Sequence, residues 1–249
     1  MLMPPSSPSA SLKPKRSPRG SAQAGTENVD ALLETAQRLF AERGIDAVSM
    51  REISREAGHR NNSALQYHFG TKEALLQAIL DAGMREVNVL RNDHIDRLFA
   101  TRRHTELRAL VEALVWPLAA KLQTKKRNTY NRFLAASQIH PDINLRPSPG
   151  DTDRGFRRLY ELVESALPQI PASVMQQRWL ASISFMLFAL ADYERISARR
   201  SKSERAFDIQ RAIENLIDML TGALAAPVSE QVLQRSAAAA EAAPEESGT

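Results

Sequence analysis

The chain has 249 residues, more than one small compact core requires, and its 43% hydrophobic and 25% charged residues are ordinary for a globular protein. It contains no cysteine, which excludes disulfides, thiolate nucleophiles and cysteine-based zinc or iron–sulfur centres. The net charge of +4 is uneven: residues 1–26 carry four basic side chains and no acid, whereas the segment from Pro227 onward is acidic.

Both ends of the chain are expected to be disordered. Residues 1–26 are rich in Pro, Ser, Lys and Arg, lack the apolar core of a secretory signal, and cannot bury enough surface to offset chain entropy. This basic arm either holds a phosphate backbone or is an ordinary solvated tail, and the sequence leaves both possibilities open. Residues 227–249 are expected to form a disordered acidic tail.

Helical periodicity begins after the basic arm. Apolar residues between 29 and 40 recur at steps of three and four, and Gly44 is a natural stop. Ser49, followed three residues later by Glu52, is a capping box that opens a short helix ending at Gly58.

Further helices are predicted along the rest of the chain. Thr71 caps one that runs with polar interruptions towards Leu98, and Pro117 should end or kink the next. The longest apolar run, 179–191, is shorter than the roughly 20 residues of a membrane span and is predicted to be a buried helix. No segment alternates as a strand, so the fold class is all-α. The apolar stripes of this half of the chain lie at 107–115, 130–134, 156–167, 174–193, which contains that run, and 209–224.

The segment 57–76 has the composition of a helix-turn-helix. Two short helices are separated by a tight turn, and the apolar face of the second is reduced to Ala64 and Leu65. A helix of this kind can be presented to the major groove, where Ser63 would permit close approach and amide side chains would read base edges. The amide candidates are Asn61, Asn62 and Gln66.

The stretches "LLETAQRLFAERGIDAVSMREISREAG" and "YHFGTKEALLQAIL", within residues 32–79, strongly resemble the DNA-binding domain of tetracycline-repressor (TetR) family transcriptional regulators. Several spaced elements agree with that family, over about a fifth of the chain. They are Leu39-Phe40 before Gly44, the cap at Ser49, Ala57-Gly58, and His68-Phe69 followed by Lys72-Glu73.

The resemblance implies roles for particular residues in DNA binding. Residues 61–66 would form the recognition helix, Tyr67 and His68 would clamp the backbone, and Lys72 would donate to a phosphate. The turn is one residue longer than is usual in the family, which shifts the register of base contacts. The complete candidate set is Ser49, Arg51, Arg60, Asn61, Asn62, Ser63, Gln66, Tyr67, His68 and Lys72.

Some residues of this segment also fit purely structural roles. Ser49 could be only a helix cap, Tyr67 could be a half-buried aromatic, and Phe69 is expected in the core. From Glu27 to Glu73 there are eight acidic against six Lys and Arg residues. DNA affinity must therefore come from a local grouping of basic residues, namely Arg51, Arg55, Arg60 and Lys72.

The resemblance also implies the organisation of the whole chain. A three-helix DNA-binding domain at 27–73 would precede a larger helical effector-binding and dimerisation domain at 74–226. The last two helices, 174–195 and 206–225, would form a homodimer interface, although both could instead be buried within the monomer. The dimer would bind a palindromic operator in double-stranded DNA, as a repressor, in the cytoplasm.

Aromatic side chains of the second domain could line a pocket for an unidentified small-molecule effector, although core packing explains them equally well. His104, Asn128, Arg132 and His140 would be polar anchors, with Arg132 and His140 on the surface by default. The pocket candidates are Trp116, Tyr130, Phe133, Tyr160, Trp179 and Phe185.

Nothing in the sequence predicts an enzyme. It lacks a glycine-rich phosphate loop, a Gly-x-Ser-x-Gly elbow and a His-Glu-x-x-His motif, and its five histidines are not spaced as metal ligands. No catalytic residue, metal or cofactor is therefore expected. The alternative is a helical adaptor that binds a protein through its C-terminal helices and lacks specific DNA affinity.

Overall fold

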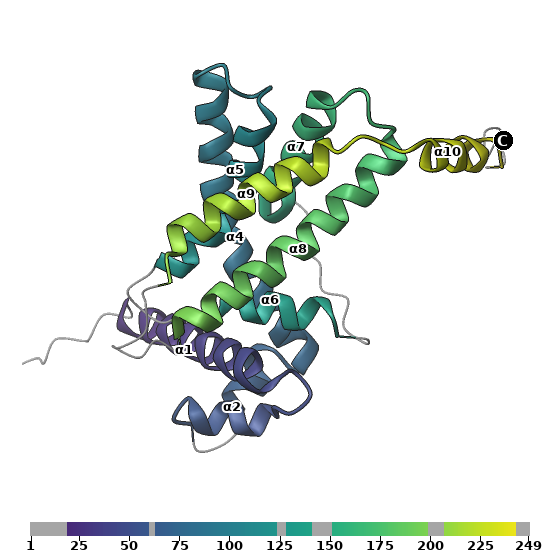
Figure 1. The fold of residues 1–249 in the computed structure, drawn as a ribbon. Coiled ribbons are helices and arrows are strands. Elements are labelled where there is room, and N and C mark those ends of the chain that lie inside the picture. Colours follow the sequence, from purple (N-terminus) through teal and green to yellow (C-terminus); the bar gives the residue numbers. More distant parts are fainter. Residues whose placement is uncertain (1–18, 60–62, 124–127, 141–150, 199–206, 243–249) are drawn as a thin grey trace, which may run out of the picture.

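The computed structural model describes residues 19–59, 63–123, 128–140, 151–198 and 207–242, and every regular element within these ranges is a helix. The all-α prediction is therefore confirmed (Figure 1). The helices are α1 (Arg19–Arg43), α2 (Met50–Glu56), α3 (Ser63–His68), α4 (Lys72–Ala100), α5 (Leu107–Ala119), the 3-10 helix η1 (Ala120–Gln123), α6 (Tyr130–Gln138), α7 (Asp151–Ala166), α8 (Ala172–Ala198), α9 (Ile209–Ala225) and α10 (Glu230–Ala242).

A small N-terminal body is formed by α1, α2, α3 and the first turns of α4, at the lower end of the molecule in Figure 1. It has its own set of fully buried apolar side chains, contributed by all four helices. Burial of these side chains fixes the angle between α2 and α3. They include Leu32, Leu39, Phe40, Ile53, Leu65, Leu75 and Leu76.

The long helix α4 connects this body to the larger C-terminal domain. Thr71 caps it, because the Thr71 Oγ1 accepts a hydrogen bond from the Ala74 N–H at 3.1 Å. Its distal part packs against α5 and α7. Polar contacts also join the domains: Gln37 donates to the Thr129 hydroxyl, and His140 Nε2 lies 3.0 Å from Asp46 Oδ1.

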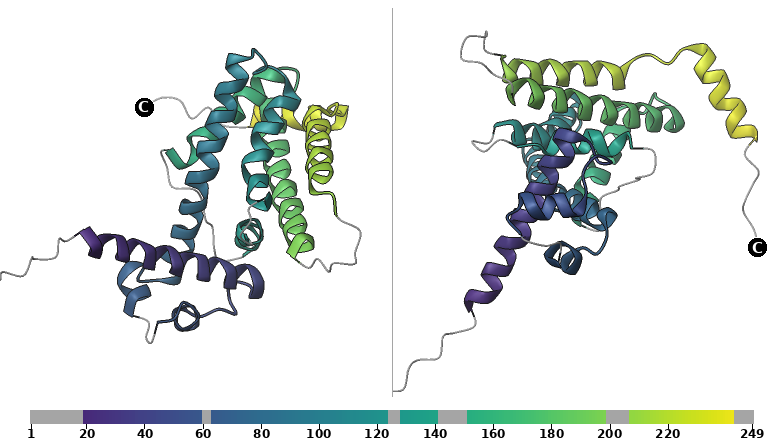
Figure 2. Two further views of the ribbon diagram at one scale, coloured as in Figure 1. Left: turned by 90° about the vertical axis from the view of Figure 1, so that its left-hand side faces the viewer. Right: turned by 90° about the horizontal axis from the view of Figure 1, so that it is seen from below.

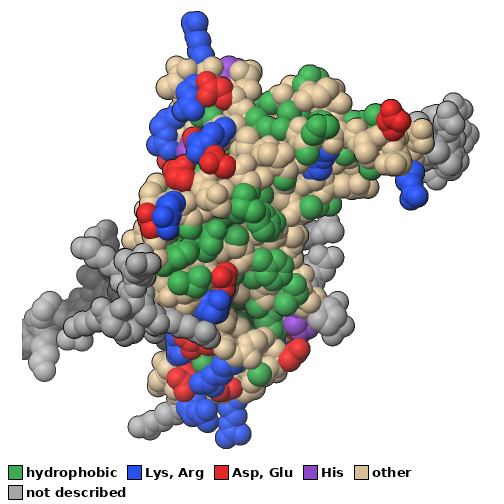
Figure 3. All heavy atoms as spheres, viewed as in Figure 1, with side chains coloured by type: hydrophobic (Ala, Val, Ile, Leu, Met, Phe, Trp, Pro, Cys, Tyr) green, Lys and Arg blue, Asp and Glu red, His purple; other side chains and the backbone are tan. Residues whose placement is uncertain are grey.

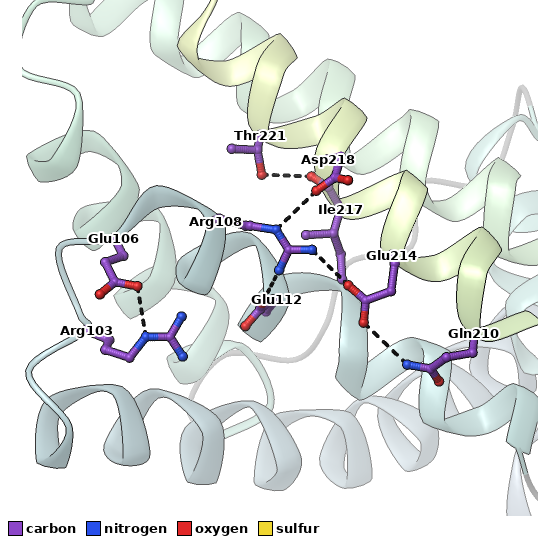
Figure 4. Close-up of polar contacts among 9 residues, drawn as sticks. All are labelled: Arg103, Glu106, Arg108, Glu112, Gln210, Glu214, Ile217, Asp218 and Thr221. Atoms are coloured by element: carbon purple, nitrogen blue, oxygen red, sulfur yellow. Dashed lines mark hydrogen bonds and ion pairs between the residues drawn. The ribbon is translucent and has the colours of Figure 1, made fainter.

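In the larger domain, α8 packs against α6 on one side and against α9 on the other. The two long helices α8 and α9 lie side by side on one outer face (Figure 2). Arg108 of α5 is held to α9 by Glu214 at 2.8 Å and Asp218 at 3.1 Å, and it also pairs with Glu112 (Figure 4). Because Arg108 is 44% exposed, these pairs orient α5 more than they stabilise it.

Helical structure extends further at both ends than the sequence analysis predicts. The first helix begins at Arg19, inside the arm expected to be disordered, because no proline follows Pro18 in this segment. Residues 1–18 lie outside the described residues. The acidic tail forms α10 because its segment EQVLQRSAAAAEA is rich in alanine and has neither glycine nor proline. The described part of this tail is therefore a helix.

The helix α10 projects away from the rest of the chain (Figures 1 and 2). The connection that leads to it is held by Arg178 of α8, whose Nη1 donates to the carbonyls of Leu224 at 2.9 Å and Ala226 at 2.6 Å. The Arg178 Nη2 donates to the Pro227 carbonyl at 3.3 Å. These bonds satisfy carbonyls at the end of α9 that lack partners within the helix.

Of the two outcomes predicted for Pro117, an end or a kink of its helix, the structure rules out the end. The helix α5 continues through Pro117 to Ala119 and then tightens into the 3-10 turn η1. Proline has no N–H and crowds the preceding turn, so the disturbance falls at the end of α5. No helix in the described ranges is both long and apolar enough to cross a membrane.

Candidate functional site

The turn between α2 and α3 is set by local interactions. The Ser49 hydroxyl accepts from the Glu52 N–H at 3.2 Å and so caps α2, as predicted. At the other end of α2, Gly58 has a φ of +83°, in the left-handed region that side chains disfavour. The Gly58 N–H donates to the Arg55 carbonyl, which closes the helix end. The turn residues 60–62 lie outside the described residues, and with them the candidates Arg60, Asn61 and Asn62.

The short helix α3 has one apolar anchor and a polar outer face. Leu65 is fully buried and Ala64 packs against the core. Ser63, Gln66, Tyr67 and His68 are exposed. Tyr67 is 86% exposed, so it is not the half-buried aromatic that the sequence leaves possible. Phe69 is only partly buried, although it packs against the core as expected.

Two arginines of the N-terminal body are neutralised by carboxylates. Arg43 pairs with Glu52, and Arg38 lies 3.3 Å from Glu42 and 3.6 Å from Glu56. Their charges are therefore largely offset and contribute little to a field that would attract DNA.

Other basic residues of this body are not paired with a carboxylate in the described ranges. Arg51 and Arg55 are exposed on α2 and form no ion pair with any residue that the structure describes. Lys72, at the start of α4, lies over the Phe40 ring at 5.8 Å from its centroid. Lys and Arg side chains also gather at the lower end of the space-filling view, where the N-terminal body lies (Figure 3). A local positive surface therefore exists beside α3 although the domain as a whole is not basic.

Hollows large enough to hold a small molecule lie among the described helices. One of about 610 Å³ lies between α1, α4 and the segment from η1 to α6, and Tyr130 is part of its wall. Another, of about 430 Å³, lies between α7 and α8. Its lining is largely aromatic and apolar, and consists of Phe156, Arg157, Tyr160, Glu161, Gln176, Trp179 and Leu180.

The six aromatic candidates do not line one pocket. Tyr160 and Trp179 line the hollow between α7 and α8, whereas Tyr130 faces the other. Phe133 is fully buried, with its ring centroid 6.5 Å from that of Phe40. The remaining two are Trp116, which packs against the core, and Phe185, which is exposed on α8. The periodicity of the sequence predicts which face of a helix is apolar, but it does not show which other helix covers that face.

A buried polar cluster joins α6 to α8. Glu194 is 5% exposed; its Oε1 accepts from Arg132 at 2.8 Å and its Oε2 accepts from the Asn131 N–H at 3.0 Å. Burial raises the pKa of the Glu194 carboxyl, and the hydrogen bond from Arg132 opposes that rise. Of the proposed polar anchors, Arg132 is thus committed to Glu194, and His140 to Asp46.

Glu194 gives the folded protein a specific pH dependence. Because its pKa is raised above the unfolded value, its contribution to stability is fully present below about pH 4.5 and is lost as pH rises through the folded pKa. We expect the free energy of unfolding of the wild type, relative to that of Glu194→Gln, to fall as pH rises from about 4.5 through the folded-state pKa of Glu194. Urea unfolding of both proteins across a pH series measures this difference. A difference that grows with pH would contradict the assignment.

Taken together, a capped helix-turn-helix with an exposed polar second helix and a separate all-helical domain define a DNA-binding regulator of transcription. Comparison with protein families agrees. Residues 32–79 match the model described as bacterial regulatory proteins of the tetR family, and residues 112–223 match the model of the tetracyclin repressor-like C-terminal domain. The chain belongs to the TetR family of transcriptional regulators.

Solved structures of that family share the fold. A TetR family protein from Shewanella sp. PV-4 superposes with a TM-score of 0.53 at 19% identity, over 79% of this chain and 97% of that one. A TetR family transcription regulator from Marinobacter aquaeolei VT8 also has a TM-score of 0.53, at 18% identity, over 81% of this chain and 97% of that one. The comparison with curated proteins gives no match.

Proposed function

We propose that the protein is a homodimeric repressor that binds a palindromic operator through α3 of each subunit and is released by a small-molecule effector. The observation that carries this proposal is the polar, exposed face of α3 beside Arg51 and Arg55, which pair with no acid in the described ranges. In this proposal residues 27–73 bind DNA, and residues 74–226 bind the effector and the second subunit. A helical adaptor would have no use for the exposed Gln66 beside these two arginines.

The outer face of α8 and α9 supports the dimer. The apolar run 179–191 is predicted from the sequence to be buried, but its residues Leu180, Phe185 and Phe188 are 43–61% exposed. On the neighbouring helix α9, Met219 is 50% exposed. Hydrophobic side chains gather on this face in the space-filling view (Figure 3). A contiguous apolar patch of this kind marks an interaction surface, and two copies related by a two-fold axis would bury it in a four-helix interface.

Coupling between the domains supports control by an effector. The helix α4 begins at Lys72 beside α3, and its distal part packs against α5 and α7. A ligand that prefers one position of α4 would change the separation of the two α3 helices, which must be about 34 Å to reach successive major-groove turns. The hollow between α7 and α8 is the site that we propose for this ligand.

Fluorescence anisotropy tests the DNA-binding proposal. The purified protein is titrated onto a duplex from its own upstream region and onto a shuffled duplex, each at two salt concentrations. Tight binding to the first duplex that survives higher salt, with weak and salt-labile binding to the second, is the expected result. A protein with no affinity for either duplex would support the adaptor.

Two substitutions separate base reading from phosphate binding. We expect Gln66→Ala to reduce discrimination between the two duplexes by about tenfold, because an amide that reads a base edge contributes about 1–3 kcal/mol. Lys72→Ala should weaken binding to both duplexes alike and lower the salt slope by about one. The same anisotropy titrations measure both effects. If Lys72→Ala changed only the preference between duplexes, the two roles would be wrongly assigned.

A further inference from the structure

Arg91 occupies a core position in α4. It lies one turn after Val87 and one turn before Ile95, and both neighbours are fully buried. Arg91 itself is 3% exposed, and its Nε has no hydrogen-bond partner within the described ranges. Among the residues that the structure describes, none forms an ion pair or hydrogen bond with the guanidinium. The group instead faces the ring of Phe156, whose centroid lies 5.7 Å from the Arg91 Cζ.

This arrangement is costly for a structural residue. Burial lowers the pKa of Arg91 to about 10, so the side chain still carries its charge at neutral pH. An unpaired charge removed from water destabilises a protein, and a cation–π contact recovers only part of that loss. Asn88, one turn earlier, shows the contrast: its Oδ1 accepts from the Gly155 N–H at 2.9 Å. Packing alone would favour an aliphatic side chain at position 91.

The ring of Phe156 contacts Arg91 and also lines the hollow of α7 and α8. Its centroid is 5.3 Å from that of Trp179. Tyr160 completes the aromatic wall, at 5.6 Å from Trp179. Phe156 is only partly buried.

We propose that Arg91 is the anion-binding group of the effector site, and that the effector is an amphipathic carboxylate. Its apolar body lies among the rings of Phe156, Tyr160 and Trp179, and its carboxylate pairs with Arg91 after the Phe156 ring turns aside. The planar guanidinium fork matches a carboxylate with two parallel hydrogen bonds. This inference rests on the proposed function in placing the effector in this hollow.

Charges at the rim of the hollow do not offer an equivalent site. Arg157 is exposed and its Nη2 lies 3.1 Å from Asp153, so its charge is already offset. Glu161 also lines the rim and would repel an anion held near the surface. The buried Arg91 is therefore the group with charge available for a carboxylate that enters deeply. Because Arg91 belongs to α4, the new ion pair acts directly on the helix that carries the DNA-binding body.

Trp179 provides a direct readout. The chain has two tryptophans, so Trp116→Phe leaves Trp179 as the single tryptophan, and its emission can be excited selectively. This parent protein is titrated with decanoate and with decan-1-ol, both below their aggregation limits. We expect a saturable change in Trp179 emission and a Kd for decanoate that is lower by about tenfold or more. Arg91→Met should bring the two Kd values to within about twofold, and Arg91→Lys should keep part of the preference.

Controls identify the residue and the state of the fold. Arg157→Met, which removes an arginine from the rim, should leave the preference for decanoate intact. Arg91→Met should unfold at a urea concentration no lower than the parent, because it removes an unpaired buried charge. Equal affinity of the parent for both probes, or loss of the preference in Arg157→Met alone, would overturn the proposal.

Operator binding by the same proteins separates this inference from the proposed function. Without a probe, Arg91→Met should bind the operator duplex as the parent does. A parent that binds the operator but shows no preference for decanoate would refute the role of Arg91 alone. A parent that prefers decanoate through Arg91 but binds no duplex specifically would refute the proposed function alone.

Discussion

Replacing both Phe185 and Phe188 with glutamate is expected to convert the proposed dimer into a folded monomer. Both side chains are exposed on α8, at 44% and 43%, so the substitutions remove little from the core of one subunit. In the dimer, each carboxylate would be buried without a partner, at a cost of about 3–5 kcal/mol. Because a two-fold interface contains every substitution twice, that cost exceeds what most interfaces can absorb.

Operator affinity should fall together with dimerisation. A monomer engages one half-site, and loss of the linked second contact weakens binding by about 100-fold or more. Sedimentation velocity measures the oligomeric state, and anisotropy measures operator affinity. The matched control is Val89→Glu with Leu90→Glu, two apolar residues that are 61% and 44% exposed on α4. If the control dissociated the dimer and the α8 variant did not, the interface would lie elsewhere. A wild-type protein that is already monomeric would contradict the proposed dimer itself.

Gly83→Ala is expected to lower the free energy of unfolding by about 2–4 kcal/mol. Helix propensity alone predicts the opposite sign, a gain of about 1 kcal/mol, because glycine is a poor residue within a helix. A Cβ at position 83 would lie only 2.1 Å from Cε2 and Cζ of the Tyr130 ring. Tyr130 is 2% exposed, and its hydroxyl donates to the Leu80 carbonyl at 2.9 Å. The ring therefore cannot move aside without losing this hydrogen bond and its packing in the core.

A double-mutant cycle checks this explanation. Tyr130→Leu should destabilise the protein by itself, because it removes a buried ring and a hydrogen bond. When Gly83→Ala is added to Tyr130→Leu, the further loss should be smaller than in the wild type by about 1 kcal/mol or more. Urea unfolding of the four proteins measures the cycle. Additive losses would show that the cost of the methyl group at position 83 has another origin.

The helix-turn-helix could be predicted from the sequence because its signals are local. Ser49 and Thr71 form their caps within three residues, Gly58 provides its own backbone conformation, and Leu65 is the apolar anchor of a short polar helix. None of these features depends on a distant part of the chain. The ends of the helical region are harder to predict because two signals conflict there. The overall composition of the acidic tail suggests disorder, but its alanine-rich segment favours the helix α10.

The interior of the larger domain could not be predicted in the same way. Whether an aromatic residue lines a hollow depends on which helix packs over it, and this separates Phe133 from Tyr160 although both lie in apolar stripes. Arg91 and Glu194 interrupt such stripes, and polar interruptions suggest exposure rather than burial. The spacing Val87, Arg91, Ile95 is a usable signal, since a charged residue four positions from each of two core residues lies on the same face of the helix.

The helix α4 spans 29 residues from Lys72 to Ala100 without interruption, which at 1.5 Å per residue makes a rod about 43 Å long. Arg91 lies about 28 Å along this rod from Lys72. A tilt of about 5° around the level of Arg91 would therefore displace the DNA-binding body by about 2.5 Å, and two symmetric subunits would change their separation by up to about 5 Å. Hydrogen bonds to DNA tolerate only a few tenths of an ångström. A lever of this length lets a small angular change abolish operator binding while α3 itself stays rigid.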